Sequence, residues 1–435
     1  MTDSLLAGVA RADVTPPLGT WLAGYPAPDR FADAVDDPLH ATALALEQGD
    51  QRAALLVLDW VIIEEEERFA IANAVEQRIG IPAGHLTIHA IQTHSAPQTQ
   101  SVFGFNPKDA AYLASALPRI VDCVCEAWES RQPARFGVGV GRCDAGVNRR
   151  QILENGEVTL GVNPFGAYDP ELTVLRFDTA EGHLASVINY GAHPTTRGAD
   201  CRGISRDWPG VAMDFLQAHT GGPVLFLNGV VGDVAPRNTR PGPPGSIEVG
   251  TVVGREAARV HDGIRCHEGA PLRIHAEEVA WPLAPLDPRE QAEAKLRALP
   301  AAPTDWFAQA TREHCQAVLA TWASGNVKTH RPFLQTLLRI GDAAILPFPG
   351  EVFAEIGLRI KAASPFAHTL VVSTANASLG YLVTREARAR GGFEVMVADT
   401  LFGAYALDHK IDDFLVAKGL QLLRNLYASP LMGEE

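Results

Sequence analysis

Short, β-rich apolar runs alternate with amphipathic stretches along most of this chain, and this alternation constrains the fold more than any other feature. Apolar runs bounded by turn residues are typical of buried strands, and the stretches between them have helical spacing. The pattern predicts a mixed α/β (α+β) fold rather than a helical bundle or a β-sandwich. The expected strands are 86–90, 135–140, 172–178, 185–190, 224–227, 343–346 and 370–373.

Local signals add a hairpin and two helices to this pattern. The runs 39–47 and 53–58 flank a turn at Gly49 and Asp50, which predicts a hairpin. A helix is expected from about 64 to 79, because Gly80 can end it and Pro82 follows. Another is expected over 352–362.

No stretch of the chain marks a clear domain boundary. The segment 237–246 is rich in Pro and Gly but lies between a strand-like and a helix-like run, so we interpret it as a surface loop. A core of this size can form in one unit. We expect one catalytic domain spanning 1–435, in which a mixed sheet is flanked by helices.

Composition and charge exclude several classes of partner. The 435 residues are 46% hydrophobic and 20% charged, with a formal net charge of −14, which argues against binding nucleic acid or an anionic membrane. The N-terminus lacks the pattern of a secretory signal, and the longest apolar run, 53–63, is too short to cross a bilayer. We therefore expect a cytoplasmic protein with six free cysteines and a small-molecule substrate. The sequence leaves the possibility of a homo-oligomer open.

Residues with catalytic or metal-binding chemistry follow the expected strands. His94, His193 and Asp233 come after 86–90, 185–190 and 224–227, and Glu351 and Tyr381 follow the last two strands. In open α/β sheets this edge holds the ligand, so we expect these groups to converge on one cleft. Two imidazoles, a carboxylate and a phenol suit Zn²⁺.

Each of these residues also has a purely structural interpretation. Either histidine could anchor a turn through a backbone hydrogen bond, and Glu351 could cap the helix expected at 352–362. Local spacing does not decide between the two interpretations, because the chain has no HExxH motif and no paired cysteines.

The order of eight motifs along the chain provides evidence for function that local spacing does not. They lie at 7–16, 93–97, 146–149, 193–195, 204–207, 228–236 and 349–351, and at Tyr381 with Thr384. In sequence and in order they resemble the motifs of the neutral ceramidase family, from about residue 7 to about residue 405. The resemblance implies a neutral ceramidase-like catalytic domain.

The resemblance also implies a metal site. In that family one zinc ion is held by two histidines, the glutamate of a PGE motif and a tyrosine, and three of these match His193, Glu351 and Tyr381. The family has two histidines in its first motif, where this chain has Gln92 and His94. We assign His94 as the fourth ligand. If the family's ligand is the earlier histidine, Gln92 stands in its place.

Two departures from the family bear on mechanism. The serine proposed to act in amide cleavage is Ala235 here, and a second catalytic tyrosine is Phe393, although the glutamate that follows is kept as Glu394. The family's immunoglobulin-like C-terminal domain is not expected in this chain, which ends at Glu435.

A mechanism in which zinc-activated water is the nucleophile is compatible with these departures, because it needs no serine nucleophile. Asp233 is expected to be the general base or a group that orients a metal ligand. Arg149 is the expected carbonyl-binding or carboxylate-binding group, and Asn228 and Phe393 are further expected substrate contacts. Arg149 could instead form a structural salt bridge. The expected substrate is a small soluble amide, lactone or ester. The alternatives are a non-catalytic metal- or ligand-binding relative and a true ceramide amidase.

Overall fold

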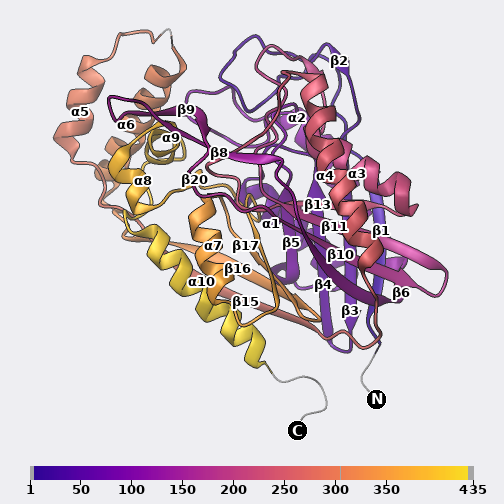
Figure 1. Ribbon diagram of the computed structural model, residues 1–435. Helices are drawn as coiled ribbons and strands as arrows, with labels where there is room; N and C mark the ends of the chain where they lie inside the picture. The colour runs from indigo at the N-terminus through magenta and orange to yellow at the C-terminus, as the bar shows by residue number, and fades with distance from the viewer. Residues whose placement is uncertain (1–3, 304, 430–435) are drawn as a thin grey trace.

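The computed structural model describes residues 4–303 and 305–429 and contains three larger sheets with helices packed outside them (Figure 1). The first sheet has the order β5 (Leu86–Ala90), β4 (Gln51–Leu58), β3 (His40–Gln48), β1 (Leu6–Asp13), β6 (Gln132–Pro133). The second is β13 (Val224–Asn228), β11 (Gly182–Tyr190), β10 (Glu171–Thr179), β7 (Arg135–Arg142). The third is β15 (Leu272–Pro282), β16 (His330–Ile340), β17 (Ala343–Pro347), β19 (His368–Val372).

Three smaller sheets contain the remaining strands of the described residues. They are β14 (Val234–Pro236) with β8 (Gly146–Ile152) and β9 (Val158–Asn163), β12 (Gly203–Ile204) with β2 (Ala34–Val35), and β18 (Glu351–Val352) with β20 (Tyr381–Leu382).

The helices cover the sheets in pairs. The first sheet carries α1 (Glu65–Ile79) and α2 (Ala110–Glu129), the second α3 (Asp207–Thr220) and α4 (Pro243–Gly263), and the third α7 (Ala354–Ala363) and α10 (Ile411–Ala428). The remaining helices are the short 3₁₀ helix η1 (Ala83–His85), α5 (Arg289–Ala298), α6 (Trp306–Ser324), α8 (Arg385–Arg390) and α9 (Phe393–Thr400). In Figure 1, α5 and α6 project beside β9 at the upper left.

The expected mixed α/β fold is confirmed, and each expected strand lies within or next to an observed one. The hairpin is β3 and β4, and α1 ends at Gly80, whose left-handed backbone (φ 71°) suits glycine. One detail differs: Glu351 belongs to the short strand β18, and α7 begins only at Ala354. The carboxylate that accepts the Ala354 N–H comes from Asp233, so Glu351 is not the cap of this helix.

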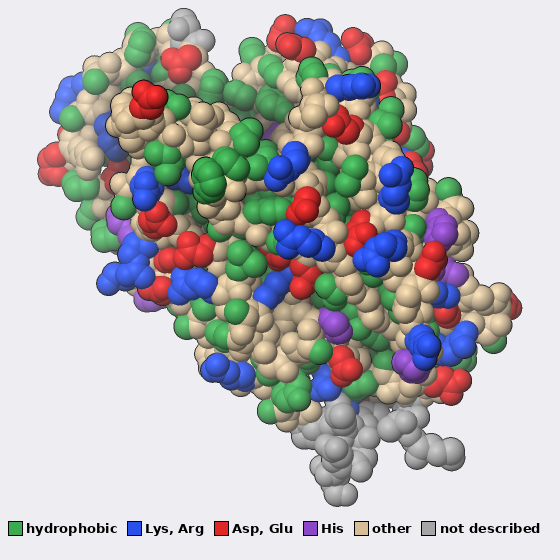
Figure 2. All heavy atoms as spheres, viewed as in Figure 1, with side chains coloured by type: hydrophobic (Ala, Val, Ile, Leu, Met, Phe, Trp, Pro, Cys, Tyr) green, Lys and Arg blue, Asp and Glu red, His purple; other side chains and the backbone are tan. Residues whose placement is uncertain are grey.

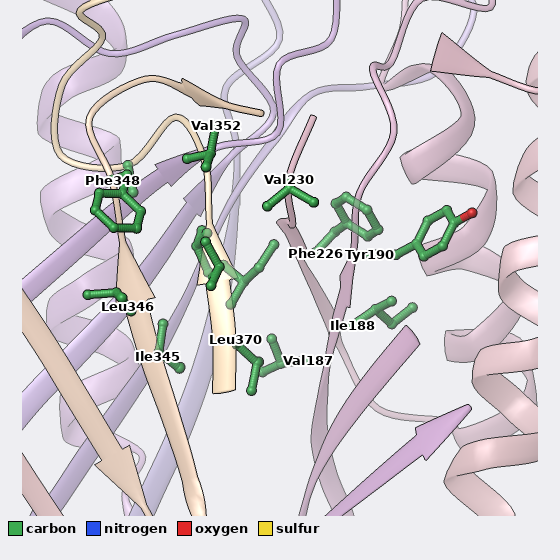
Figure 3. Close-up of a cluster of buried hydrophobic side chains, with 14 of the residues drawn as sticks. Val187, Ile188, Tyr190, Phe226, Val230, Ile345, Leu346, Phe348, Val352 and Leu370 are labelled. Atoms are coloured by element: carbon green, nitrogen blue, oxygen red, sulfur yellow. The ribbon is translucent and has the colours of Figure 1, made fainter. Parts of the chain in front are cut away.

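Alternation along the strands separates two buried layers. Leu44 and Leu46 of β3 face the large central core, whereas Ala43 and Ala45 face α1 and α2 on the other side. Figure 3 shows side chains of β11 and β13 meeting those of β17 and β19 in the central core. Apolar residues of this core come from positions as far apart as Leu5 and Leu426.

The three sheets are joined at the carboxyl ends of β5, β13 and β19. The His89 side chain, on β5, is fully buried. Its Nε2 atom accepts the Asn228 N–H at 3.0 Å, so Nδ1 carries the proton and donates to Ser373 O at 3.0 Å. Ser373 N–H in turn donates to Asn228 O at 3.0 Å. One imidazole therefore links three sheets.

Two further expectations can be compared with the structure. All six cysteines are free thiols, as expected. Between residues 4 and 429, Thr304 aside, none of the helices combines the length and apolarity needed to span a bilayer.

We predict that His89 makes folding sensitive to acid. Burial lowers the pKa of His89 to about 3, so the folded protein keeps the ring neutral while the unfolded chain binds a proton below about pH 6.5. Stability from this group is complete above pH 6.5 and is lost as the pH falls towards 3, with a slope of up to about 1.4 kcal/mol per pH unit. Urea unfolding measured between pH 7.5 and 4 should show this slope.

The variant His89→Gln should be less stable at pH 7.5 and should lack that part of the slope. Replacement of the exposed His409 by Gln is the matched control and should leave the curve unchanged. An unaltered slope in His89→Gln would contradict the assignment.

Candidate functional site

A cavity of about 470 Å³ lies beyond the carboxyl ends of β5, β13 and β19. Its lining includes three of the predicted metal ligands, two of the predicted substrate contacts and many apolar side chains. The lining residues are Gly24, Tyr25, Pro26, Val61, Ile62, Gln92, His94, Gln98, Val102, Phe105, Arg149, Leu160, Gly161, Thr195, Ala235, Trp306, Glu351, Tyr381, Phe393, Val397, Leu401 and Phe402. Figure 2 shows the surface hollowed between the α6 and β9 side and the opposite loops, with hydrophobic side chains in the recess. A larger recess of about 790 Å³ contains none of the predicted site residues.

His193 and Glu351 form a buried pair beside the cavity. The loop after β11 carries His193, and β18 carries Glu351; they are 1% and 6% exposed. His193 Nε2 lies 2.8 Å from Glu351 Oε2. The other ring nitrogen, Nδ1, lies 2.5 Å from the carbonyl oxygen of Val231, in the loop after β13. Two loops from different sheets thus fix one imidazole.

The protonation of this pair bears on whether a cation fits between the two side chains. A carbonyl oxygen only accepts hydrogen bonds, so His193 Nδ1 carries the proton and Nε2 of the neutral ring presents a lone pair to Glu351. Burial and the nearby Arg149 act to lower the pKa of His193 and Glu351 acts to raise it, with a net shift downward. With the ring neutral, two acceptors face each other, and a cation between them would satisfy both. This donor set fits a divalent transition metal.

Tyr381 lies on β20, which pairs in parallel with β18, so that Tyr381 is the register partner of Glu351. Its ring is 6.2 Å from that of His193, centroid to centroid. Arg149 Nη2 donates to the Tyr381 hydroxyl oxygen at 2.9 Å. Burial raises the pKa of Tyr381, and the Arg149 charge acts against this. A phenolate at this position would therefore need further positive charge.

Glu394, on α9, holds Arg149 in place. Its Oε1 accepts from Arg149 Nε at 2.8 Å and its Oε2 from Arg150 Nη1 at 2.6 Å. Burial acts to raise the pKa of Glu394, but the two arginines outweigh it and lower the pKa. The structural salt bridge considered for Arg149 is therefore present. Arg149 also lines the cavity, so both of its interpretations fit the geometry.

Two side chains, His94 and Gln92, are candidates for the first of the predicted metal ligands. His94 and Gln92 both line the cavity from the loop after β5. The rings of His94 and His193 meet edge to face with centroids 6.1 Å apart. Within the described part of the chain, His94 Nδ1 and Gln92 Oε1 have no hydrogen-bond partner. Gln92 also has a positive φ of 67°, which is rare for a non-glycine residue. The geometry leaves both side chains as ligand candidates.

The predicted metal ligands do not form a compact group of donor atoms. In residues 4–303 and 305–429, the groups of three His, Cys, Asp or Glu donors that all lie within 4.8 Å of one another are His219 with His261 and Asp262, and Glu64 with Glu66 and Glu67. The set of His94, His193 and Glu351 is not among them. The case for a metal therefore rests on the His193–Glu351 pair.

His193, Asp233 and Asn228 are absent from the described residues that line the cavity, although His193 contacts Glu351, which does line it. The Asp233 carboxylate accepts from Ala354 N at 2.8 Å and from Asn148 Nδ2 at 2.9 Å, and it borders a separate recess. The Asn228 side chain is fully buried and donates to Ile91 O at 2.6 Å. The prediction that Asn228 contacts substrate and that Asp233 faces the cleft does not match these positions. Asn228 is the last residue of β13 and Asp233 follows that strand, but both side chains are buried and bonded to other parts of the protein.

The two departures from the family pattern, Ala235 and Phe393, both line the cavity. Phe393 packs edge-on against Tyr381, with ring centroids 6.2 Å apart. Sequence reasoning missed Tyr25 and Trp306, which reach the cavity from an N-terminal loop and from α6. No local pattern marks them, because the contacts that bring them there are long-range.

Comparison with known proteins agrees with this architecture. A family model described as neutral/alkaline non-lysosomal ceramidase, N-terminal, matches residues 5–239, more than half of the chain. No curated protein matches.

Two solved structures share the fold. The neutral ceramidase from Pseudomonas aeruginosa has a TM-score of 0.73 at 19% identity, covering 98% of this chain and 75% of that one. A structure described as ceramidase complexed with C2 has a TM-score of 0.72 at 18% identity, with the same coverage of 98% and 75%. At such identities the likeness shows the fold alone, whereas the match over residues 5–239 shows the family. The chain belongs to the neutral/alkaline non-lysosomal ceramidase family.

Proposed function

We propose that this protein is a zinc-dependent hydrolase that uses water to cleave a small amide, ester or lactone. The observation that carries the proposal is the buried His193–Glu351 pair, in which a nitrogen lone pair faces a carboxylate at 2.8 Å. Membership of a family named for ceramidases supports hydrolysis as the type of reaction.

The residues that would hold the ion are His193, Glu351 and Tyr381, with His94 or Gln92 completing the set. When bound, Zn²⁺ supplies Lewis-acid chemistry that activates water and polarises a carbonyl. The Val231 carbonyl keeps His193 in the tautomer that can act as a ligand.

Arg149 has two tasks in this proposal. Its Nη2 donor supports negative charge on the Tyr381 oxygen, and its position in the cavity lets the guanidinium stabilise charge that develops on a substrate carbonyl. Glu394 restrains the guanidinium, so little reorganisation is needed during the reaction. Low exposure strengthens each of these electrostatic interactions.

The walls of the cavity suggest the character of the substrate. Side chains such as Val61, Phe105, Leu160 and Trp306 surround the polar floor. A cavity of about 470 Å³ with such walls fits a small molecule whose cleavable carbonyl is attached to an apolar group. Phe393 would contact that group beside Tyr381.

Two alternatives have specific support. A true ceramide amidase would also need apolar walls, and the fold is shared with ceramidases. A non-catalytic metal- or ligand-binding protein is favoured by the absence of a hydroxyl at both Ala235 and Phe393.

Turnover of a panel distinguishes these functions. The panel contains short-chain and aromatic N-acyl amides, esters, lactones and detergent-solubilised ceramide, each assayed before and after chelation and after restoring Zn²⁺. The proposal expects chelator-sensitive hydrolysis of at least one small substrate. Turnover of ceramide alone would support the amidase, and binding without turnover across the panel would support the non-catalytic alternative.

We predict that the protein purified without chelators contains about one tightly held zinc ion per chain. His193→Ala and Glu351→Ala should each lose it, because each removes one of few ligands. Comparing His94→Ala with Gln92→Ala identifies the further ligand, since only the ligand's replacement should lower the zinc content. Elemental analysis measures all four variants. Full zinc content in His193→Ala would rule out the site.

Ala235→Ser should not raise turnover of the best panel substrate. Water serves as the nucleophile in this proposal, so the added hydroxyl has no step to perform. A gain of about tenfold, equal to about 1.4 kcal/mol in the barrier, would instead indicate a serine mechanism. Ala235→Gly, which adds no hydroxyl, is the control for changes in cavity shape.

Asp233 is proposed as a positioning residue, with a general base as the competing role. Burial raises the pKa of Asp233 to about 6, so a base here would give activity that falls as the pH drops through about 6. Asp233→Asn should destabilise the fold by about 1–3 kcal/mol, because an amide cannot accept from both Ala354 and Asn148.

The pH profile of Asp233→Asn separates the two roles. Positioning predicts reduced turnover with an unchanged acid limb, whereas a base predicts about a 10²-fold loss together with loss of that limb. Glu355→Gln is the matched control, because Glu355 lies in the first turn of α7, the helix whose first N–H donates to Asp233.

A further inference from the structure

A second cluster of metal-binding side chains lies far from the cavity, where α3 and α4 end. His219 is in the last turn of α3, and His261 and Asp262 are in the last turn of α4. The helix α3 starts beside the loop of His193 and rises about 1.5 Å per residue, so its far end lies roughly 20 Å away. Figure 2 shows histidine side chains gathered at the right-hand edge, beside the end of α3.

The donor atoms of these three residues are close together. His219 Nε2 lies 2.7 Å from Asp262 Oδ1, and His261 Nδ1 lies 3.6 Å from the same oxygen. One ligand atom from each residue fits within 4.8 Å of the other two. Two imidazole nitrogens and one carboxylate oxygen are a donor set that binds Zn²⁺ and related ions.

His261 makes the cluster unusual. Its side chain is only 6% exposed, and neither ring nitrogen has a hydrogen-bond partner within the described residues. A distance of 3.6 Å to Asp262 is too long to count as a hydrogen bond. A buried imidazole with two unsatisfied nitrogens costs stability unless another group binds it.

The neighbours of His261 leave its nitrogens available to a ligand. The ring of His183 packs edge-on against it with centroids 5.0 Å apart. The nitrogens of His183 are already engaged, at 3.3 Å with Asp178 Oδ1 and at 3.2 Å with Ser186 Oγ. His183 therefore supports the His261 ring and does not compete for its nitrogens.

Charge at the cluster also suits a cation. Two helices end there, and the carboxyl end of a helix carries partial negative charge. Asp262 adds a full negative charge. The nearby Arg176 is paired with Asp178 at 2.9 Å, so its positive charge is largely balanced. By contrast, the other compact group, Glu64 with Glu66 and Glu67, already holds the Lys108 ammonium at 2.6–3.1 Å.

We propose that His219, His261 and Asp262 form a second site for a divalent transition metal, of the Zn²⁺ class, which clamps the end of α3 to the end of α4. His261 is the fixed ligand, and the more exposed His219 and Asp262 adjust around the ion. Three protein ligands leave a position open to solvent, so this site fills when free metal is present and is weaker than the site at the cavity.

Calorimetric titration of Zn²⁺ into the protein as purified tests the proposal. The wild-type protein should take up one further equivalent, and His219→Gln should lose it or bind at least about tenfold more weakly. His275→Gln is the matched control, because His275 has the same kind of contact to a carboxylate, 3.2 Å to Glu277 Oε2, without a third donor within reach in the described residues. It should bind as the wild type does.

Thermal unfolding gives a second readout. Added Zn²⁺ should raise the Tm of the wild type and of His275→Gln but not of His219→Gln or Asp262→Asn. Hydrolysis should be unaffected in His219→Gln, because the cluster is remote from the cavity. Uptake of Zn²⁺ by His219→Gln with wild-type affinity, or no further uptake by the wild type, would overturn the proposal.

Discussion

The imidazole of His89 is the contact on which the arrangement of the site depends. It accepts from Asn228 and donates to Ser373, so it links the carboxyl ends of β5, β13 and β19 directly. The loops that carry His94, His193 and Asp233 begin directly after β5, β11 and β13, and β11 pairs in parallel with β13. Loss of this contact would remove one of the links among the three sheets and leave the hydrogen bond from Ser373 N–H to Asn228 O as another.

The contact between β5, β13 and β19 fixes the position of the site, and a few polar side chains within the site determine what chemistry it can perform. His193 is oriented by Val231, and Arg149 by Glu394, so two of the polar side chains are held by partners that do not themselves line the cavity. The His193–Glu351 contact is different, because two acceptors meet there. Ala235 offers no nucleophile, so hydrolysis at this site would depend on water and on the electrostatics of the floor.

Much of the fold and of the candidate site could be predicted from the sequence, and what could not be predicted has a physical cause. Strand periodicity and the placement of His94, His193, Glu351 and Tyr381 after strands predicted a common edge, because parallel strands share the direction of their carboxyl ends. Position after a strand does not determine where a side chain points. Asp233 satisfied the sequence criterion, yet its carboxylate turns to the first residue of α7.

Residues brought in by long-range packing were not predictable from local patterns. Trp306 comes from α6 and Tyr25 from a loop before β2, and neither lies near a motif of the site. The choice between Gln92 and His94 was also left open by the sequence, and both side chains line the cavity.

Anomalous diffraction at the zinc absorption edge, from crystals grown without chelator, tests the central claim most directly. The account predicts a peak beside His193 and Glu351, with His193 Nε2 about 2.0–2.1 Å from the ion. The absence of a peak there, with His193 Nε2 still in direct contact with Glu351, would contradict it.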